Sequence, residues 1–128
     1  MAFLYSPRFQ LSIRLLFWLA LIFAVVMASL PHPPKLPTDS LGDKFTHMLA
    51  FATLAGLAAL GFPAADRWRV AERLSFLGAL IEVIQSIPAL QRDCDIRDWI
   101  ADTLSIVVVT AIMGFFLDRM QRRASSAG

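Results

Sequence analysis

Four apolar stretches, separated by short polar segments, make up most of the chain. Each is close to the roughly 20 residues that a helix needs to cross a bilayer, and no series of short alternating strands competes with them. The pattern therefore predicts an all-α integral membrane protein with four transmembrane helices in one bundle. Pro88 falls in the last turn of the third helix, where we expect a kink or an early end. The predicted helices lie near residues 12–30, 45–62, 70–90 and 98–117.

The composition agrees with a membrane domain. Hydrophobic residues make up 57% of the chain and charged residues 17%, which is more apolar than an ordinary soluble domain. A length of 128 residues suits one domain spanning 1–128. The single cysteine, Cys94, excludes an intramolecular disulfide and a cysteine-based zinc site. The small net charge and the dispersed basic residues predict no nucleic-acid partner.

The first apolar stretch is expected to stay in the mature protein. Arg8 and Arg14 precede it, as basic residues precede the apolar part of a signal peptide. However, Val26, Met27 and Ala28 match a small-x-small cleavage site poorly. We therefore predict a retained first helix.

The basic residues are unevenly divided between the two sides of the predicted bundle. Of the 12 Lys and Arg residues, only Lys35, Lys44, Arg92 and Arg97 lie on the side opposite the two termini. The positive-inside rule therefore predicts that both termini are cytoplasmic and that the segments 31–44 and 91–97 face outward.

Glu82 lies at the centre of the third apolar stretch, residues 74–90. A carboxylate at the centre of a membrane helix costs about 2.5 kcal/mol or more, so we expect it to have a partner or a function. Gln85 lies one turn further along the same helix face, and Gly78 lies one turn earlier. Small residues allow helices to approach closely, which indicates that this face points into the bundle.

Other polar residues gather beside the two predicted outer segments. Asp43 and His47 lie four residues apart in the second helix, as Asp98 and Asp102 do in the fourth. This spacing places each pair on one helix face, so three helices direct polar groups at one outward-facing cleft. The predicted ligand-binding residues are Asp43, Lys44, His47, Glu82, Gln85, Arg92, Asp95, Asp98 and Asp102.

Several of these residues also have a purely structural explanation. In this explanation Asp98 caps the N-terminus of the fourth helix, and His47 is a hydrated side chain near the membrane interface. Arg92 is either an ordinary loop charge or a partner of Glu82 or Asp98. A single histidine within this cluster, without a metal-ligand motif, predicts no metal site and no cofactor.

Three segments resemble the VanZ-like family of small bacterial membrane proteins. Residues 43–51 resemble its D-K-x-x-H-x-x-x-F motif, residues 82–85 its E-x-x-Q motif, and residues 92–105 its R-x-x-D-x-x-D-x-x-x-N-x-x-G motif. Two positions differ, because Asp102 stands where the family usually has Asn and Ser105 where it usually has Gly.

The resemblance covers roughly residues 43–114. It implies a single VanZ-like domain with four helices, located as a multi-pass protein in the bacterial inner (cytoplasmic) membrane. The family's namesake is associated with low-level resistance to the glycopeptide teicoplanin, an antibiotic that acts on the cell envelope.

We favour a non-enzymatic cell-envelope protein that recognises a membrane lipid or a lipid-linked cell-wall precursor. In this hypothesis Lys44 and Arg92 contact phosphate, Glu82, Gln85 and Asp98 bind amine or sugar groups, and His47 orients Glu82 or Asp43. The resemblance adds a link to glycopeptide resistance.

Two alternatives stay open at this stage. One is a membrane-embedded enzyme acting on a lipid headgroup, with His47, Glu82 and Asp98 as candidate catalytic residues. The other is an accessory or assembly subunit, as a homo-oligomer or with a membrane-protein partner. A proton-coupled transporter agrees less well, because the sequence has no visible inverted repeat.

Overall fold

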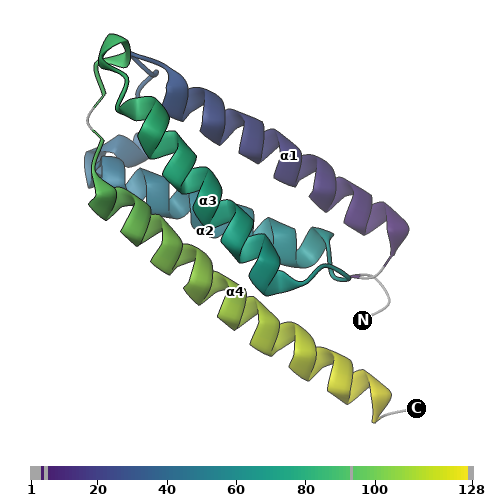
Figure 1. Cartoon of the computed structure of the whole chain (residues 1–128). Helices are drawn as coiled ribbons and strands as arrows, with labels where there is room; N and C mark the ends of the chain where they lie inside the picture. Colours follow the sequence, from purple (N-terminus) through teal and green to yellow (C-terminus); the bar gives the residue numbers. More distant parts are fainter. Residues whose placement is uncertain (1–3, 5, 93, 127–128) are drawn as a thin grey trace.

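The computed structural model describes residues 4, 6–92 and 94–126, and it describes the backbone but not the side chains of residues 38 and 39. Within this part of the chain the structure is helical and contains no strand. Both chain ends lie at one end of the bundle (Figure 1), which we call the terminal end. The opposite, two-loop end holds the connections 30–42 and 86–95. The helices are α1 (Pro7–Ser29), η1 (Pro37–Leu41), α2 (Asp43–Gly61), α3 (Arg67–Gln85), η2 (Pro88–Leu90) and α4 (Ile96–Ser125).

The predicted helices are present, but their ends differ. α1 begins early, at Pro7, because the Ser6 hydroxyl accepts a hydrogen bond from the Phe9 N–H at 3.3 Å and Pro7 occupies the first helical position. α3 ends at Gln85, short of residue 90, and the short helix η2 begins at Pro88. The early end expected from Pro88 is thus confirmed. α4 continues to Ser125, well beyond the predicted end at residue 117.

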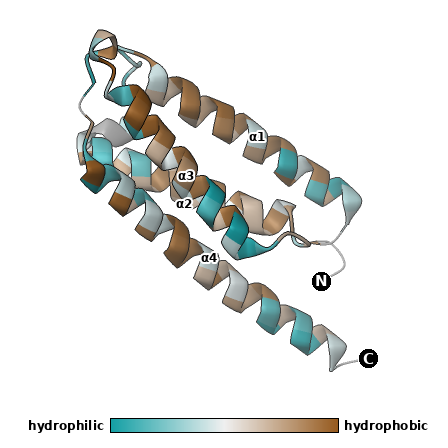
Figure 2. Cartoon of the chain, in the orientation of Figure 1, coloured by the Kyte–Doolittle hydropathy of each residue, from teal (hydrophilic) through white to brown (hydrophobic). Residues whose placement is uncertain are grey.

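Three of the four long helices, α1, α2 and α4, are long and apolar enough to cross a membrane. α3 is not among them, because its first two turns contain Arg67, Arg69, Glu72 and Arg73. Figure 2 shows this hydrophilic start of α3 at the terminal end. The composition of the other helices indicates a membrane protein, whereas a fourth span stays a prediction.

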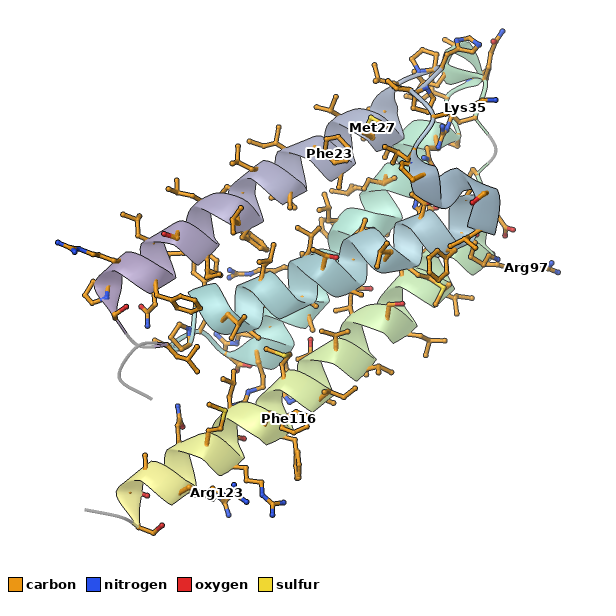
Figure 3. All side chains as sticks on the ribbon, turned by 180° about the vertical axis from the view of Figure 1, so that it is seen from behind. Phe23, Met27, Lys35, Arg97, Phe116 and Arg123 are labelled. Carbon is orange, nitrogen blue, oxygen red and sulfur yellow. The ribbon has the colours of Figure 1, made fainter. Side chains whose placement is uncertain are left out.

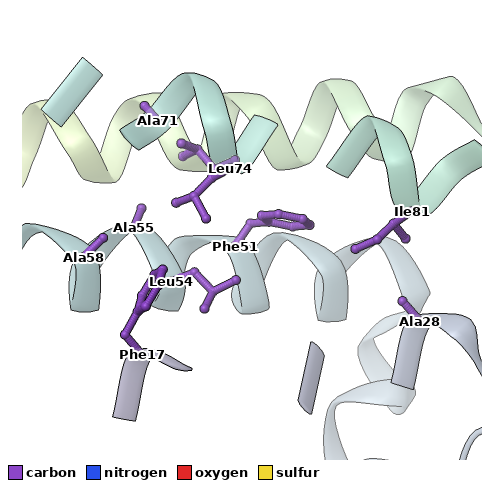
Figure 4. Close-up of a cluster of buried hydrophobic side chains, with 10 residues drawn as sticks. Phe17, Ala28, Phe51, Leu54, Ala55, Ala58, Ala71, Leu74 and Ile81 are labelled. Atoms are coloured by element: carbon purple, nitrogen blue, oxygen red, sulfur yellow. The ribbon is translucent and has the colours of Figure 1, made fainter. Parts of the chain in front are cut away.

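The core forms around α2, which contacts all three other long helices. One side of α2 is buried from Phe51 to Ala58 and packs between α1 and α3 (Figure 4). The buried apolar residues are Phe17, Ala28, Phe51, Leu54, Ala55, Ala58, Ala71, Leu74, Ile81 and Ile106.

Large apolar side chains also cover the outer faces of the bundle. Leu19 and Ile22 of α1 are exposed, as are Phe115 and Phe116 of α4, and Figure 3 shows Phe116 on the outside of α4. Soluble monomers rarely expose such continuous apolar surface, whereas lipid-facing helices require it. The exposed apolar side chains and the apolar composition of α1, α2 and α4 thus both indicate a membrane protein.

Side-chain contacts fasten the terminal end. Arg14 Nε of α1 donates a hydrogen bond to the Gly61 carbonyl at 2.7 Å, and so caps the last turn of α2. Arg67 of α3 makes two hydrogen bonds with the Asp118 carboxylate of α4, at 3.0 and 2.7 Å. Gly114 leaves room for this pair, because a Cβ at that position would overlap the Arg67 guanidinium.

Candidate ligand-binding site

His47 lies between two carboxylates at the two-loop end. Gly42 precedes α2 with a φ of +99°, which glycine adopts without strain, and the helix then begins at Asp43. His47 Nε2 lies 3.9 Å from Asp43 Oδ2, and His47 Nδ1 lies 3.6 Å from Asp102 Oδ2 of α4. The predicted pairing along α2 is therefore present, and the second neighbour of His47 is Asp102 rather than Glu82.

Asp102 is the most deeply buried charged residue among those described, with 1% of its surface exposed. Its Oδ1 atom is buried and has no hydrogen-bond partner in the described part of the chain. A buried carboxylate without enough partners is costly, so the contact with His47 matters for its stability. Asp102 thus belongs to the predicted polar cluster, as the deepest member of it.

Lys44 and Arg92, the two cationic residues of the cluster, each lie beside an aspartate from another segment of the chain. Lys44 Nζ of α2 lies 3.2 Å from Asp98 Oδ1 of α4. Arg92 Nη2, from the α3–α4 connection, lies 3.7 Å from Asp43 Oδ2 of α2. Of the two explanations left open for Arg92, a loop charge or a partner of Glu82 or Asp98, the structure instead places Arg92 beside Asp43 at the start of α2, while Lys44 lies beside Asp98.

Glu82 is buried to 7% exposure and holds the α3–α4 connection. Its Oε2 atom accepts a hydrogen bond from the Asp95 backbone N–H at 3.0 Å. The structural role of Glu82 is therefore to fix the segment that leads into α4.

Asp95, and not Asp98, caps α4. Asp95 Oδ1 accepts a hydrogen bond from the Arg97 backbone N–H at 2.9 Å. The alternative explanation of Asp98 as the cap was thus wrong, and Asp98 is free to contact Lys44. The sequence did not distinguish these two aspartates because both have the residue type that caps favour.

Gln85 makes its side-chain hydrogen bond to α1. Its Nε2 atom donates a buried hydrogen bond to the Ala28 carbonyl of α1 at 3.1 Å. This bond satisfies one of the carbonyls that the last turn of a helix leaves without an internal partner. The Gln85 amide thus fastens α1 to α3, and a role of Gln85 in ligand binding stays a prediction.

A cleft of about 490 Å³ adjoins the cluster, within the size range of ligand pockets. It lies between α1 and α2 under the proline-containing connection 30–42. Its walls are mainly apolar and include Phe23 and Met27, which Figure 3 shows in the half of α1 nearest Lys35. Asp43, His47 and Arg92 supply charged or ionisable groups to its lining.

The contribution of α1 to this cleft was not predicted from the sequence. Ala20, Ala24 and Ala28 all line it, spaced four residues apart on one helix face. That stripe of small residues is the signal that was available, but the only polar side chain near that end of α1, Ser29, bonds within its own helix, to the Val25 carbonyl.

The cluster consists of charge pairs and an imidazole. Among the described side chains, no three His, Cys, Asp or Glu residues are grouped so as to hold a metal ion. The arrangement is suited to hydrogen bonding and ion pairing with a polar group at the end of an apolar cleft.

Comparisons of the chain with known protein families, with curated proteins and with solved structures found no match.

Proposed function

We propose that this protein is a four-helix protein of the bacterial inner membrane, with cytoplasmic termini and an outward-facing two-loop end. The apolar outer faces of α1 and α4 and the excess of arginines at the terminal end support this placement. In this arrangement the whole of α3, 19 residues or about 28 Å, is needed to cross, and the long side chains of Arg67, Arg69 and Arg73 extend from its first turns to the cytoplasmic interface.

The proposed function is recognition of a lipid or lipid-linked headgroup at the cleft between α1 and α2. The observation that carries the proposal is the composition of this cleft, with mainly apolar walls and the three ionisable residues Asp43, His47 and Arg92. An amphipathic ligand has the same division between a hydrocarbon chain and a polar group. The VanZ-like motifs contain these three residues, and the resemblance adds glycopeptide sensitivity as a phenotype to measure.

Filling the cleft tests this function directly. Ala24→Trp places a large side chain in the cleft wall, and Leu19→Trp places the same side chain on the exposed face of α1 as a matched control. We expect Ala24→Trp to lose the lipid that co-purifies with the wild-type protein, measured by native mass spectrometry, and to change sensitivity to glycopeptides. Leu19→Trp should retain both properties. Equal lipid retention by the two folded variants would contradict the proposal.

The position of His47 favours a second candidate, an enzyme that acts on the bound headgroup. A histidine flanked by the buried carboxylate of Asp102, and lining the cleft, has the arrangement of a general base. This function predicts a covalently altered lipid after incubation with the purified protein, and no such product with His47→Ala. A lipid mass profile that stays the same with and without the wild-type protein would exclude it.

A further inference from the structure

Arg92 and Asp43 face each other in the lining of the cleft without forming a close hydrogen bond. The nearest approach between their charged groups is 3.7 Å, beyond ordinary N–H···O distances. The Arg92 side chain is 16% exposed and the Asp43 side chain 66% exposed, so the pair is accessible from the cleft side. A guanidinium has five N–H donors in a planar fork, and a carboxylate has two acceptor oxygens, so both groups retain binding capacity.

The other charges of the cluster are already committed. Asp98 is paired with Lys44, Asp102 lies against His47, and Glu82 and Asp95 hold the start of α4. The pair that remains toward the cleft has no net charge. Asp43 Oδ2 lies near both Arg92 Nη2, at 3.7 Å, and His47 Nε2, at 3.9 Å. A purely anionic group bound to Arg92 would lie beside the Asp43 carboxylate, and a purely cationic group bound to Asp43 would lie beside Arg92. A headgroup with both charges satisfies both residues.

We propose that the cleft selects a zwitterionic phosphate–amine headgroup that inserts between Arg92 and Asp43. The guanidinium of Arg92 holds the phosphate in two-point contact, and the Asp43 carboxylate accepts hydrogen bonds from a primary ammonium. The hydrocarbon chain lies along the apolar walls formed by α1 and α2. A trimethylammonium group has no N–H to donate to Asp43, and a glycerol headgroup has no positive charge. This inference rests on the proposed function, because it names the ligand class of the same cleft.

A lipid competition experiment tests the selection. The purified full-length protein is equilibrated with phosphatidylethanolamine, phosphatidylcholine, phosphatidylglycerol and a polyprenyl phosphate, with matched acyl chains for the first three, and bound lipid is counted by native mass spectrometry. We expect the wild-type protein to prefer phosphatidylethanolamine over each other lipid by about fivefold, the ratio that one additional partly exposed ion pair supplies.

Two variants separate the two contacts. Asp43→Asn should remove the preference for phosphatidylethanolamine over phosphatidylglycerol, while Arg92→Gln should weaken the binding of all four phosphate lipids. Lys35→Gln, which removes a cation from the exposed connection 30–42, is the control and should retain the wild-type preference. If Asp43→Asn fails to fold, competition for the wild-type cleft by soluble glycerophosphoethanolamine against glycerophosphoglycerol gives the same comparison.

The outcomes distinguish this inference from the proposed function. The headgroup assignment is overturned if phosphatidylethanolamine and phosphatidylglycerol bind equally, or if the protein prefers the polyprenyl phosphate. If Ala24→Trp also loses lipid binding in that case, the proposed lipid recognition at the cleft is retained. Lipid binding that Ala24→Trp does not reduce overturns both.

Discussion

Asp102 shows at the scale of one residue what the sequence could and could not predict. Its place in the polar cluster followed from helical spacing, because residues four apart on one helix share a face whatever the rest of the fold does. Its partner did not follow, since the contact with His47 depends on the relative height and rotation of α2 and α4. The same limit explains Arg92 and Gln85, whose actual partners are Asp43 and the Ala28 carbonyl.

The contact between His47 and Asp102 predicts an asymmetric pair of substitutions. His47→Ala leaves the buried Asp102 carboxylate without its partner and should lower the free energy of unfolding by about 3 kcal/mol. Asp102→Asn removes the buried charge and should change stability by less than about 1 kcal/mol. The double variant should be more stable than His47→Ala alone. Thermal unfolding in detergent measures all three, and a larger loss for Asp102→Asn than for His47→Ala would contradict this account.

Cys94 reports on Glu82 through its own titration. Desolvation, together with its hydrogen bond to the Glu82 carboxylate, raises the pKa of the Cys94 thiol above its ordinary value. Because the thiolate is the reactive form, alkylation of Cys94 should require a higher pH than that of a free thiol. Glu82→Gln removes the negative charge, so the pH at which half of the thiol is ionised should fall and alkylation at pH 8 should become faster.

The rate of iodoacetamide labelling as a function of pH gives this midpoint for the single cysteine of the chain. Arg97→Gln is the control, because it changes the charge near Cys94 by one unit without removing the contact to Glu82. A midpoint that stays the same in Glu82→Gln would show that Glu82 does not reach the thiol.

At the scale of the helices, the sequence predicted which segments are helical but not the residues at which each helix begins and ends. Apolar periodicity identifies each helix, but ends depend on local groups such as Ser6, Asp95 and Pro88 that stop or start the hydrogen-bonding pattern. α4 extends past its apolar part because Arg119, Arg122 and the residues around them continue the helix without needing a membrane. The sequence therefore indicated which segments cross the bundle but not how far each extends.

Two glycines give a matched test of how α3 is held against α4. Gly114→Ala should displace the Arg67 guanidinium from Asp118, and the gain in helix propensity, at most about 1 kcal/mol, should not be realised. Gly56→Ala meets only Val109 Cγ1 at 3.9 Å and should keep the propensity gain. We expect Gly56→Ala to melt at a higher temperature than the wild-type protein and Gly114→Ala at a lower one. The reverse order would contradict the packing at the terminal end.

At the scale of the whole molecule, the bundle is longer on one side than a bilayer is thick. α4 has 30 residues, about 45 Å, compared with a hydrocarbon core of about 30 Å. Its last turns, with Arg119, Arg122 and Arg123, thus extend beyond the other helices at the terminal end. In the proposed orientation this extension lies in the cytoplasm.

Cysteine labelling tests this orientation. Cys94 should react with a membrane-impermeant maleimide added to spheroplasts, because it is exposed in the α3–α4 connection. Ser126→Cys, in a Cys94→Ser background, should react only after the membrane is permeabilised. Labelling of position 126 in intact spheroplasts, with none of Cys94, would invert the proposed topology.

The hydrogen bond from Gln85 to the Ala28 carbonyl has a consequence for how the protein is made. Its two residues are 57 positions apart, so all of α1 and α2 is synthesised before Gln85. Until then the last turn of α1 lacks this partner, and only its contacts with α2 hold it in place. The cleft is therefore complete only once α3 and the segment after it that carries Arg92 have been synthesised, although its lining comes largely from α1 and α2.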